Sequence, residues 1–150
     1  MRNLEKIWAI VRKDLLTELR SRETLPSMVL FSLLVVLIFN FTFEPGSEAV
    51  AEASPGILWV AIIFAGTLGL NRSFVSEQEE ECLQGLLLCP IDRGVLYLGK
   101  MLGNLLFILI MEGLVFPIFA ILFNLDFVGA LLPLLPVFFL ATLGFAALGT

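Results

Sequence analysis

The sequence contains no histidine, and this absence removes a large part of protein chemistry. Histidine is the commonest general base near neutral pH and the commonest metal ligand, and it activates the nucleophile in Ser-His and Cys-His pairs. The run from Gly94 to Met101 is close to a phosphate-binding loop, but methionine cannot ligate magnesium there and no strand precedes the run. The chain is therefore not expected to be an enzyme, to hydrolyse nucleotide itself or to bind a metal.

Charged residues are also scarce. They make up 15% of the 150 residues, against roughly 25% in soluble domains, whereas hydrophobic residues make up 59%. The net charge is −5, from 9 basic and 14 acidic residues, and no basic patch interleaved with aromatic residues is present. A nucleic-acid partner is not expected, and the mean hydropathy of +0.99 indicates that a lipid bilayer surrounds the chain.

Four long stretches are almost free of charge, and each is close to the roughly 20 residues that cross a hydrocarbon core of about 30 Å. They are residues 25–43, 53–71, 101–123 and 127–150. We therefore predict an all-α membrane protein with four transmembrane helices in one domain over residues 1–150. The last stretch ends the chain with no basic anchor after it, so we expect either a fragment or further spans in the natural protein.

The basic residues predict the orientation. All nine fall before the first span or between the second and third spans. In the connection 44–56 and the turn 124–126, every charged residue is acidic. Positive charge is retained on the cytoplasmic side of membrane proteins. The N-terminus and the loop 72–100 are therefore predicted to be cytoplasmic.

The segment 4–20 has the spacing of an amphipathic helix. Its apolar residues recur at steps of three and four, and they are Leu4, Ile7, Trp8, Val11, Leu15 and Leu19. We expect this helix to lie in the cytoplasmic headgroup layer before the chain turns at Pro26 into the bilayer. The alternative is a small cytoplasmic helix that packs on protein.

A second cytoplasmic helix is predicted over residues 77–88. Ser76 can cap its start while Glu79 reaches back to the cap amide, and the helix should end before Pro90. Asp92 is then placed to cap the helix that leads into the third span. One side of the short helix is apolar and needs a cover, for which the favoured candidate is another protein. That side consists of Cys82, Leu83, Leu86 and Leu87.

Two features lie inside the predicted spans. Glu112 is the one ionisable residue well inside a span, and such carboxylates usually face protein or a wet cavity. It is predicted to face the bundle, either as a gate on a pathway or as a hydrogen-bonded packing residue. Small residues at steps of four allow helices to approach closely. These are Ala61, Ala65 and Gly69 in the second span and Gly99 and Gly103 at the start of the third.

Several of these segments resemble one family. Residues 79–90 and 97–100 are similar to the loop between the second and third spans of ABC-2-type permeases. The chain as a whole is similar to the CcmB family, the haem exporter B permeases of cytochrome c maturation. The block 64–74, which includes Asn71 and Arg72 at the cytoplasmic end of the second span, carries this similarity most specifically. Further matching segments are 13–15, 18–20, 25–28, 39–41, 57–60, 85–88 and 90–93.

The resemblance implies a six-span permease of the bacterial inner membrane, of which this chain would cover the first four spans. It implies a separate ATP-binding subunit resembling CcmA, a second permease copy, haem-handling membrane proteins resembling CcmC and CcmD, and a haem chaperone resembling CcmE. ATP would be bound by the partner and haem handled by the complex, either exported or released on its chaperone. The residues expected to dock the ATPase are Glu79, Cys82, Leu83, Leu86, Leu87 and Pro90.

Two alternatives remain at this stage, namely an ABC-2-type permease for another substrate and an ion or proton pathway that uses Glu112. Haem iron is usually held by His, Cys, Met or Tyr. Since histidine is absent and both cysteines and Tyr97 are predicted to be cytoplasmic, we hypothesise that no cofactor is bound directly and that haem iron is not ligated by this chain.

Overall fold

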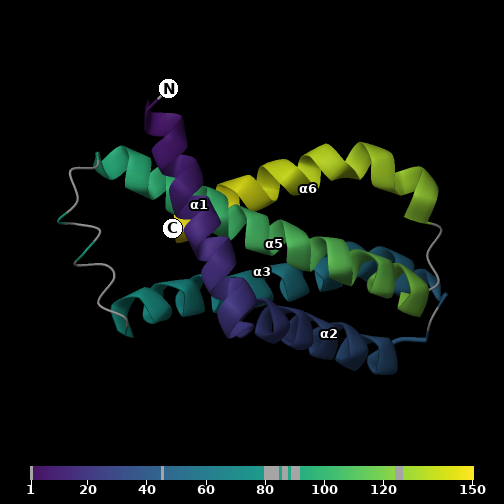
Figure 1. Cartoon of the computed structure of the whole chain (residues 1–150). Helices are drawn as coiled ribbons and strands as arrows, with labels where there is room; N and C mark the ends of the chain where they lie inside the picture. Colours follow the sequence, from purple (N-terminus) through teal and green to yellow (C-terminus); the bar gives the residue numbers. More distant parts are fainter. Residues whose placement is uncertain (1, 45, 80–84, 86–87, 89–91, 124–126) are drawn as a thin grey trace.

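The computed structural model describes residues 2–44, 46–79, 85, 88, 92–123 and 127–150. Within this part of the chain it contains five long helices (Figure 1). They are α1 (Arg2–Ser21), α2 (Thr24–Thr42), α3 (Glu48–Glu79), α5 (Arg93–Phe123) and α6 (Phe127–Gly149). The all-α prediction is thus confirmed.

Three of these helices are long and apolar enough to cross a membrane, over Thr24–Thr42, Glu48–Val75 and Arg93–Phe123. A shorter apolar stretch, Leu135–Gly149, lies in the C-terminal half of α6. The first three predicted spans therefore coincide with helices of spanning length. The fourth coincides with α6, and its crossing of the membrane stays a prediction.

Helices α2, α3, α5 and α6 run along a common direction, and α1 crosses α5 steeply (Figure 1). At one end of this bundle, Asn40 near the end of α2 donates a hydrogen bond to the carbonyl of Leu122 near the end of α5 (3.0 Å). At the other end, Arg72 of α3 meets Glu23 just before α2 (2.7 Å). Successive spans therefore alternate in direction.

The two ends of the bundle differ in charge. The end that carries α1 (Figure 1), which we call the basic end, also holds Arg72, which pairs with Glu23, Arg93 at the start of α5, and Lys100, which pairs with Asp14 of α1. The opposite end, the acidic end, holds Glu44 in the connection between α2 and α3 and Glu48 at the start of α3. The fold thus gathers the basic residues at one end, as the predicted topology requires.

Helix α3 is longer than the predicted second span at both ends. It begins at Glu48, includes Pro55 and continues to Glu79. The prediction that Ser76 caps a separate helix is therefore wrong, because Ser76 lies inside α3. A hydropathy window ends where charge begins, but good helix formers such as glutamate continue the helix into water.

The predicted turn at Pro26 is also wrong. The chain turns at Arg22, whose φ of 52° lies in the left-handed region, and α2 begins two residues later at Thr24. Pro26 lies in the first turn of α2, where a helix has no internal partner for a backbone N–H and proline is tolerated. Asp92, in contrast, directly precedes α5, and its backbone carbonyl accepts from the amide of Leu96 (3.2 Å), as expected for a cap residue.

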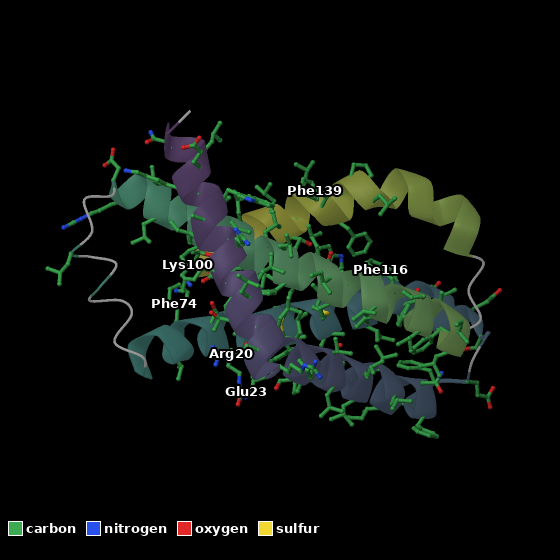
Figure 2. All side chains as sticks on the ribbon, in the orientation of Figure 1. Arg20, Glu23, Phe74, Lys100, Phe116 and Phe139 are labelled. Carbon is green, nitrogen blue, oxygen red and sulfur yellow. The ribbon has the colours of Figure 1, made fainter. Side chains whose placement is uncertain are left out.

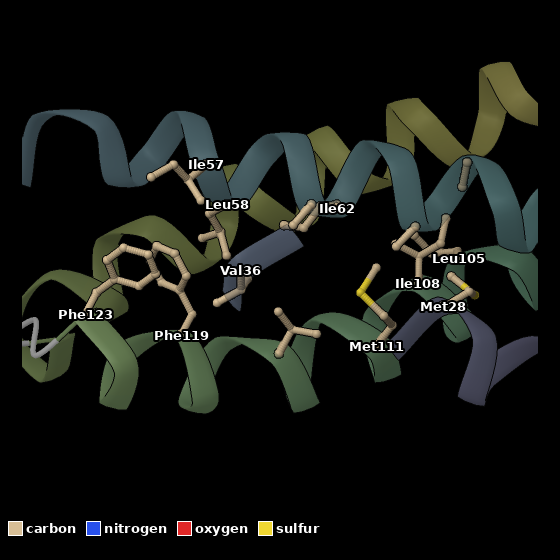
Figure 3. Close-up of a cluster of buried hydrophobic side chains, with 14 of the residues drawn as sticks. Met28, Val36, Ile57, Leu58, Ile62, Leu105, Ile108, Met111, Phe119 and Phe123 are labelled. Atoms are coloured by element: carbon tan, nitrogen blue, oxygen red, sulfur yellow. The ribbon is translucent and has the colours of Figure 1, made fainter. Parts of the chain in front are cut away.

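Close packing holds the spans together (Figure 3). Lipid tails are as apolar as leucine, so helices in a bilayer associate through tight contact rather than through the hydrophobic effect. The predicted small residues provide that contact, since Ala61 and Ala65 are fully buried and a Cβ at Gly69 would collide with Met28. The buried cluster is formed by Met28, Val36, Val50, Ile57, Leu58, Ala61, Ile62, Ala65, Leu105, Ile108, Met111, Val115, Phe119, Phe123 and Ala146.

The helix predicted over residues 4–20 is confirmed as α1, but only part of its surface packs on α5. Ile10 and Val11 are buried, whereas Leu4 (71% exposed), Trp8 (66%) and Leu19 (64%) on the predicted apolar side are not covered by protein. The packing alternative is therefore correct for one side of α1. The interfacial position of the other side stays a prediction.

Candidate functional site

The predicted ATPase-docking residues belong to the connection between α3 and α5. Glu79 is the last residue of α3, and Cys82, Leu83, Leu86, Leu87 and Pro90 lie outside the described residues. The three described residues of this connection, Gly85, Leu88 and Asp92, are exposed. Helix α3 ends and α5 begins at the basic end of the bundle (Figure 1).

Asn71 and Arg72 are both exposed near the end of α3. The Arg72 guanidinium donates to Glu23 Oε2 at 2.7 Å, and about half of each side chain or more faces solvent. Exposed ion pairs contribute about 0–1 kcal/mol. This pair therefore lies where α3 meets the start of α2 but contributes little to the stability of that contact.

A buried ion pair joins α1 to α5 at the same end. The Lys100 ammonium lies 3.1 Å from Asp14 Oδ2, and the two side chains are only 8% and 9% exposed. Lys13 approaches the other carboxylate oxygen at 3.6 Å. Figure 2 shows Lys100 beside α1 where that helix crosses α5. Sequence reasoning missed this pair, because nothing local in either segment predicts its partner.

Glycines allow α1 to approach α5 this closely. A Cβ at Gly99 would lie 3.0 Å from three atoms of Ile10, and one at Gly103 would lie 3.2 Å from Asp14 Oδ2. The sequence did predict a close approach at these two glycines, and this is confirmed. It did not predict that α1 is the helix that packs against them.

Glu18 fixes the joint between α1 and α2. Its carboxylate is buried and accepts a hydrogen bond from the backbone N–H of Leu25 at 2.8 Å. That amide belongs to the first turn of α2, where N–H groups have no partner within the helix. Arg20 and Glu23 are labelled close to this joint in Figure 2. A carboxylate of α1 thus binds the start of α2 and helps to set the angle between the two helices.

At the basic end, α6 is tied to α5 by two polar contacts. Tyr97 donates from its hydroxyl to the carbonyl of Ala147 at 2.6 Å, and buried Asn104 donates to Thr150 Oγ1 at 3.1 Å. Together with the ion pair of Lys100, these contacts make the first turns of α5 a meeting point of α1 and α6. A displacement of α5 would therefore act on both α1 and α6 through these contacts.

Glu112 faces the bundle, as predicted. Its side chain is buried, and Thr142 of α6 donates a hydrogen bond to its Oε1 at 2.6 Å. Near it, Phe138 of α6 stacks on Trp59 of α3 (ring centroids 5.0 Å apart) and meets Phe116 edge-on (4.8 Å). The Glu112 hydrogen bond thus joins α5 to α6, and the aromatic contacts of Phe138 join these two helices to α3.

The role of Glu112 beyond this packing stays a hypothesis. An alanine variant that is well expressed and fully active would contradict a functional role. In the part of the chain that the structure describes, no three His, Cys, Asp or Glu residues lie close enough together to hold a metal ion.

The chain is similar to known membrane proteins over most of its length. The family described as CcmB protein matches residues 5–150. Heme exporter protein B of Escherichia coli K12 is 28% identical over 97 residues, which cover 65% of this chain and 44% of that protein. Heme exporter protein B of Bradyrhizobium diazoefficiens is 28% identical over 121 residues, covering 81% and 54%.

A third relative has a different name. The probable ABC transporter permease protein NosY of Pseudomonas aeruginosa PAO1 is 33% identical over 105 residues, which cover 65% of this chain and 38% of that protein. The chain spans about half the length of the curated relatives it matches. No solved structure matches it significantly.

Proposed function

The chain belongs to the CcmB family, and on this premise we propose that it is the permease subunit of an ATP-driven complex of cytochrome c maturation. In this role it couples ATP hydrolysis by a separate subunit, resembling CcmA, to haem export or to release of a haem-loaded periplasmic chaperone. The family match over residues 5–150 carries the proposal. Three helices of spanning length support a multi-pass membrane subunit.

The proposed placement puts the basic end in the cytoplasm of a bacterium and α1 in the headgroup layer of the inner membrane. The support for α1 is its steep crossing of α5 and its uncovered Leu4, Trp8 and Leu19. A helix with a basic polar side and an apolar side that holds a tryptophan is typical of the membrane interface. With α6 as a fourth span, the chain would supply the first four spans of a six-span permease.

The proposed mechanism is mechanical. The leucine side of the connection between α3 and α5 seats in a groove of the ATPase, and closure of two nucleotide-bound ATPase subunits moves that connection as a rigid body. Nucleotide biases the permease only through such differential contact. The ion pair at Lys100 and the polar contacts of Tyr97 and Asn104 support transmission from α5 to α1 and α6.

A charged substitution at Leu86 or Leu87 tests this coupling. We expect Leu86→Asp to weaken binding of the ATPase subunit by at least about 2 kcal/mol, or roughly thirtyfold, because it introduces a charge at the centre of the contact. The measurement is the affinity of the purified ATPase subunit for the permease complex in nanodiscs, together with its ATP turnover there.

Leu88→Asp is the matched control. Leu88 is 86% exposed and does not belong to the predicted docking side of the same segment, which consists of Cys82, Leu83, Leu86 and Leu87. The control should bind and stimulate the ATPase normally. Equal behaviour of the two variants, or full affinity of Leu86→Asp, would remove the docking role from this connection.

A second candidate function is a permease for a substrate other than haem, and the likeness to NosY favours it. The two candidates differ in their partners. Capture of an ATPase subunit together with haem-handling membrane proteins and a haem chaperone supports cytochrome c maturation, whereas capture of an ATPase subunit alone supports the other substrate.

We propose further that this chain handles haem without ligating its iron. The support is chemical, since histidine, the ligand used most widely, does not occur in the sequence. An axial-ligand absorption signature in the purified subunit that disappears on substitution of one residue would contradict this proposal.

A further inference from the structure

A groove lies in the angle between α1 and α5. It is lined among others by Leu4, Ile7, Trp8 and Val11 of α1 and by Leu102 and Leu106 of α5, and its volume is about 330 Å³. Small-molecule sites in proteins have volumes of about 300–1,000 Å³. The groove is therefore large enough to hold part of an organic ligand, and its apolar lining selects an apolar one.

The groove runs along α5. Leu102, Leu106 and Leu109 follow one another at steps of four and three, so they form one stripe along the helix, about 10 Å long at 1.5 Å per residue. Helix α1 closes this stripe at the basic end. A ligand in the groove would thus lie parallel to the spans, with one end against α1. This is the orientation of an acyl chain in the leaflet next to α1.

The exposed charge of α1 is mainly positive. Two of its acidic residues are turned inward, since Asp14 pairs with Lys100 and Glu18 accepts from the amide of Leu25. Trp8 lines the groove and is exposed, and exposed Arg12 follows it by four residues, so the two side chains lie on the same side of α1. Lys6 lies on the opposite flank, because two residues along a helix give a rotation of about 200°.

We propose that the groove binds one acyl chain of an anionic phospholipid, whose phosphate is held by Arg12 beside the Trp8 indole. A guanidinium matches the geometry of phosphate oxygens, and tryptophan prefers the level of the head groups. The proposal rests on the interfacial position of α1 proposed above. It does not involve residues 79–90, so it stands or falls separately from ATPase docking.

Fluorescence quenching tests the site in the whole chain. The sequence has two tryptophans, so Trp59→Phe leaves Trp8 as the sole reporter. In phosphatidylcholine vesicles, we expect brominated phosphatidylglycerol to quench Trp8 with an apparent affinity roughly fivefold higher than that of brominated phosphatidylcholine at equal mole fraction. This ratio corresponds to the attraction of one cation near the membrane surface.

Two matched variants separate the head group from general charge. Arg12→Gln should abolish the preference for the anionic lipid, whereas Lys6→Gln, which removes the same charge from the opposite flank, should keep it. Equal quenching by both lipids in the parent chain would overturn the proposed head-group site. Quenching by neither would overturn the interfacial position of α1 itself.

Native mass spectrometry of the chain with both tryptophans gives a second test that does not depend on Trp59→Phe. We expect the chain released from membranes, and its Lys6→Gln variant, to retain a bound anionic phospholipid that Arg12→Gln loses. Retention of only zwitterionic lipid, or of a protein helix in place of lipid, would overturn the proposal.

Discussion

At the scale of single residues, the pair of Asp14 and Lys100 is the contact on which the position of α1 depends most. Burying two charges is costly, and a buried pair is maintained only while both partners are present. The second oxygen of Asp14 is also approached by Lys13, so its carboxylate is surrounded by positive charge. Loss of this one carboxylate would remove the counter-ion of a buried ammonium group.

We expect Asp14→Asn to lower the free energy of unfolding by about 3–5 kcal/mol, the cost of removing one member of a buried ion pair. Glu23→Gln is the matched control, because it removes one partner of the exposed pair with Arg72 and should cost less than about 1 kcal/mol. Both values are measured by reversible unfolding in mixed detergent micelles. Similar losses in the two variants would show that burial does not distinguish the pairs.

At the scale of helices, the crossing of α1 and α5 depends on the absence of side chains. Gly99 faces Ile10 so closely that a Cβ there would require a displacement, whereas Gly113 on the same helix has no neighbour within 4 Å of such an atom. A side chain is thus tolerated at Gly113 but not at Gly99. The difference arises because α1 packs against Gly99 and not against Gly113.

Gly99→Val should therefore loosen α1, because overpacking a close contact costs about 1–3 kcal/mol. Since Arg12 and Arg20 are exposed on α1, we expect trypsin to cleave this helix faster, on the order of tenfold, as it opens more often. Gly113→Val carries the same intrinsic helix penalty without the collision and should be cleaved at the parent rate. Unchanged cleavage of Gly99→Val would mean that α1 does not rest on Gly99 in the membrane.

The sequence predicts the helices better than it predicts their ends. The first span was placed within one residue of α2, because charged residues precede it and a glutamate follows it. The helix that contains the second predicted span is longer than that span, since α3 runs from Glu48 to Glu79 and hydropathy carries no signal for a helix beyond the charge-free stretch. The turn before α2 depends on the backbone of Arg22, a residue without the turn preference of glycine or asparagine.

At the scale of the whole molecule, side-chain pairs between distant segments are what sequence reasoning could not supply. The small residues Gly99 and Gly103 predicted that some helix approaches α5, but only the fold identifies it as α1. Glu112 was predicted to face the bundle because a carboxylate is costly in lipid, but Thr142 as its donor had no signal of its own. The uneven distribution of basic residues, in contrast, is visible in the sequence itself, so it predicts the orientation without knowledge of any contact.

The orientation of the bundle follows from that asymmetry and is directly testable. Cys89→Ser leaves Cys82 as the sole thiol, since the sequence has two cysteines. We expect a membrane-impermeant maleimide added to intact cells to leave Cys82 unlabelled until the membrane is permeabilised, because positively charged segments are retained on the cytoplasmic side of membrane proteins. In a chain without native cysteines, Ser47→Cys in the connection at the acidic end should be labelled without permeabilisation. The reverse pattern would place the connection between α3 and α5 in the periplasm, where no ATP-binding subunit could reach it, and both the docking proposal and the coupling mechanism would have to be abandoned.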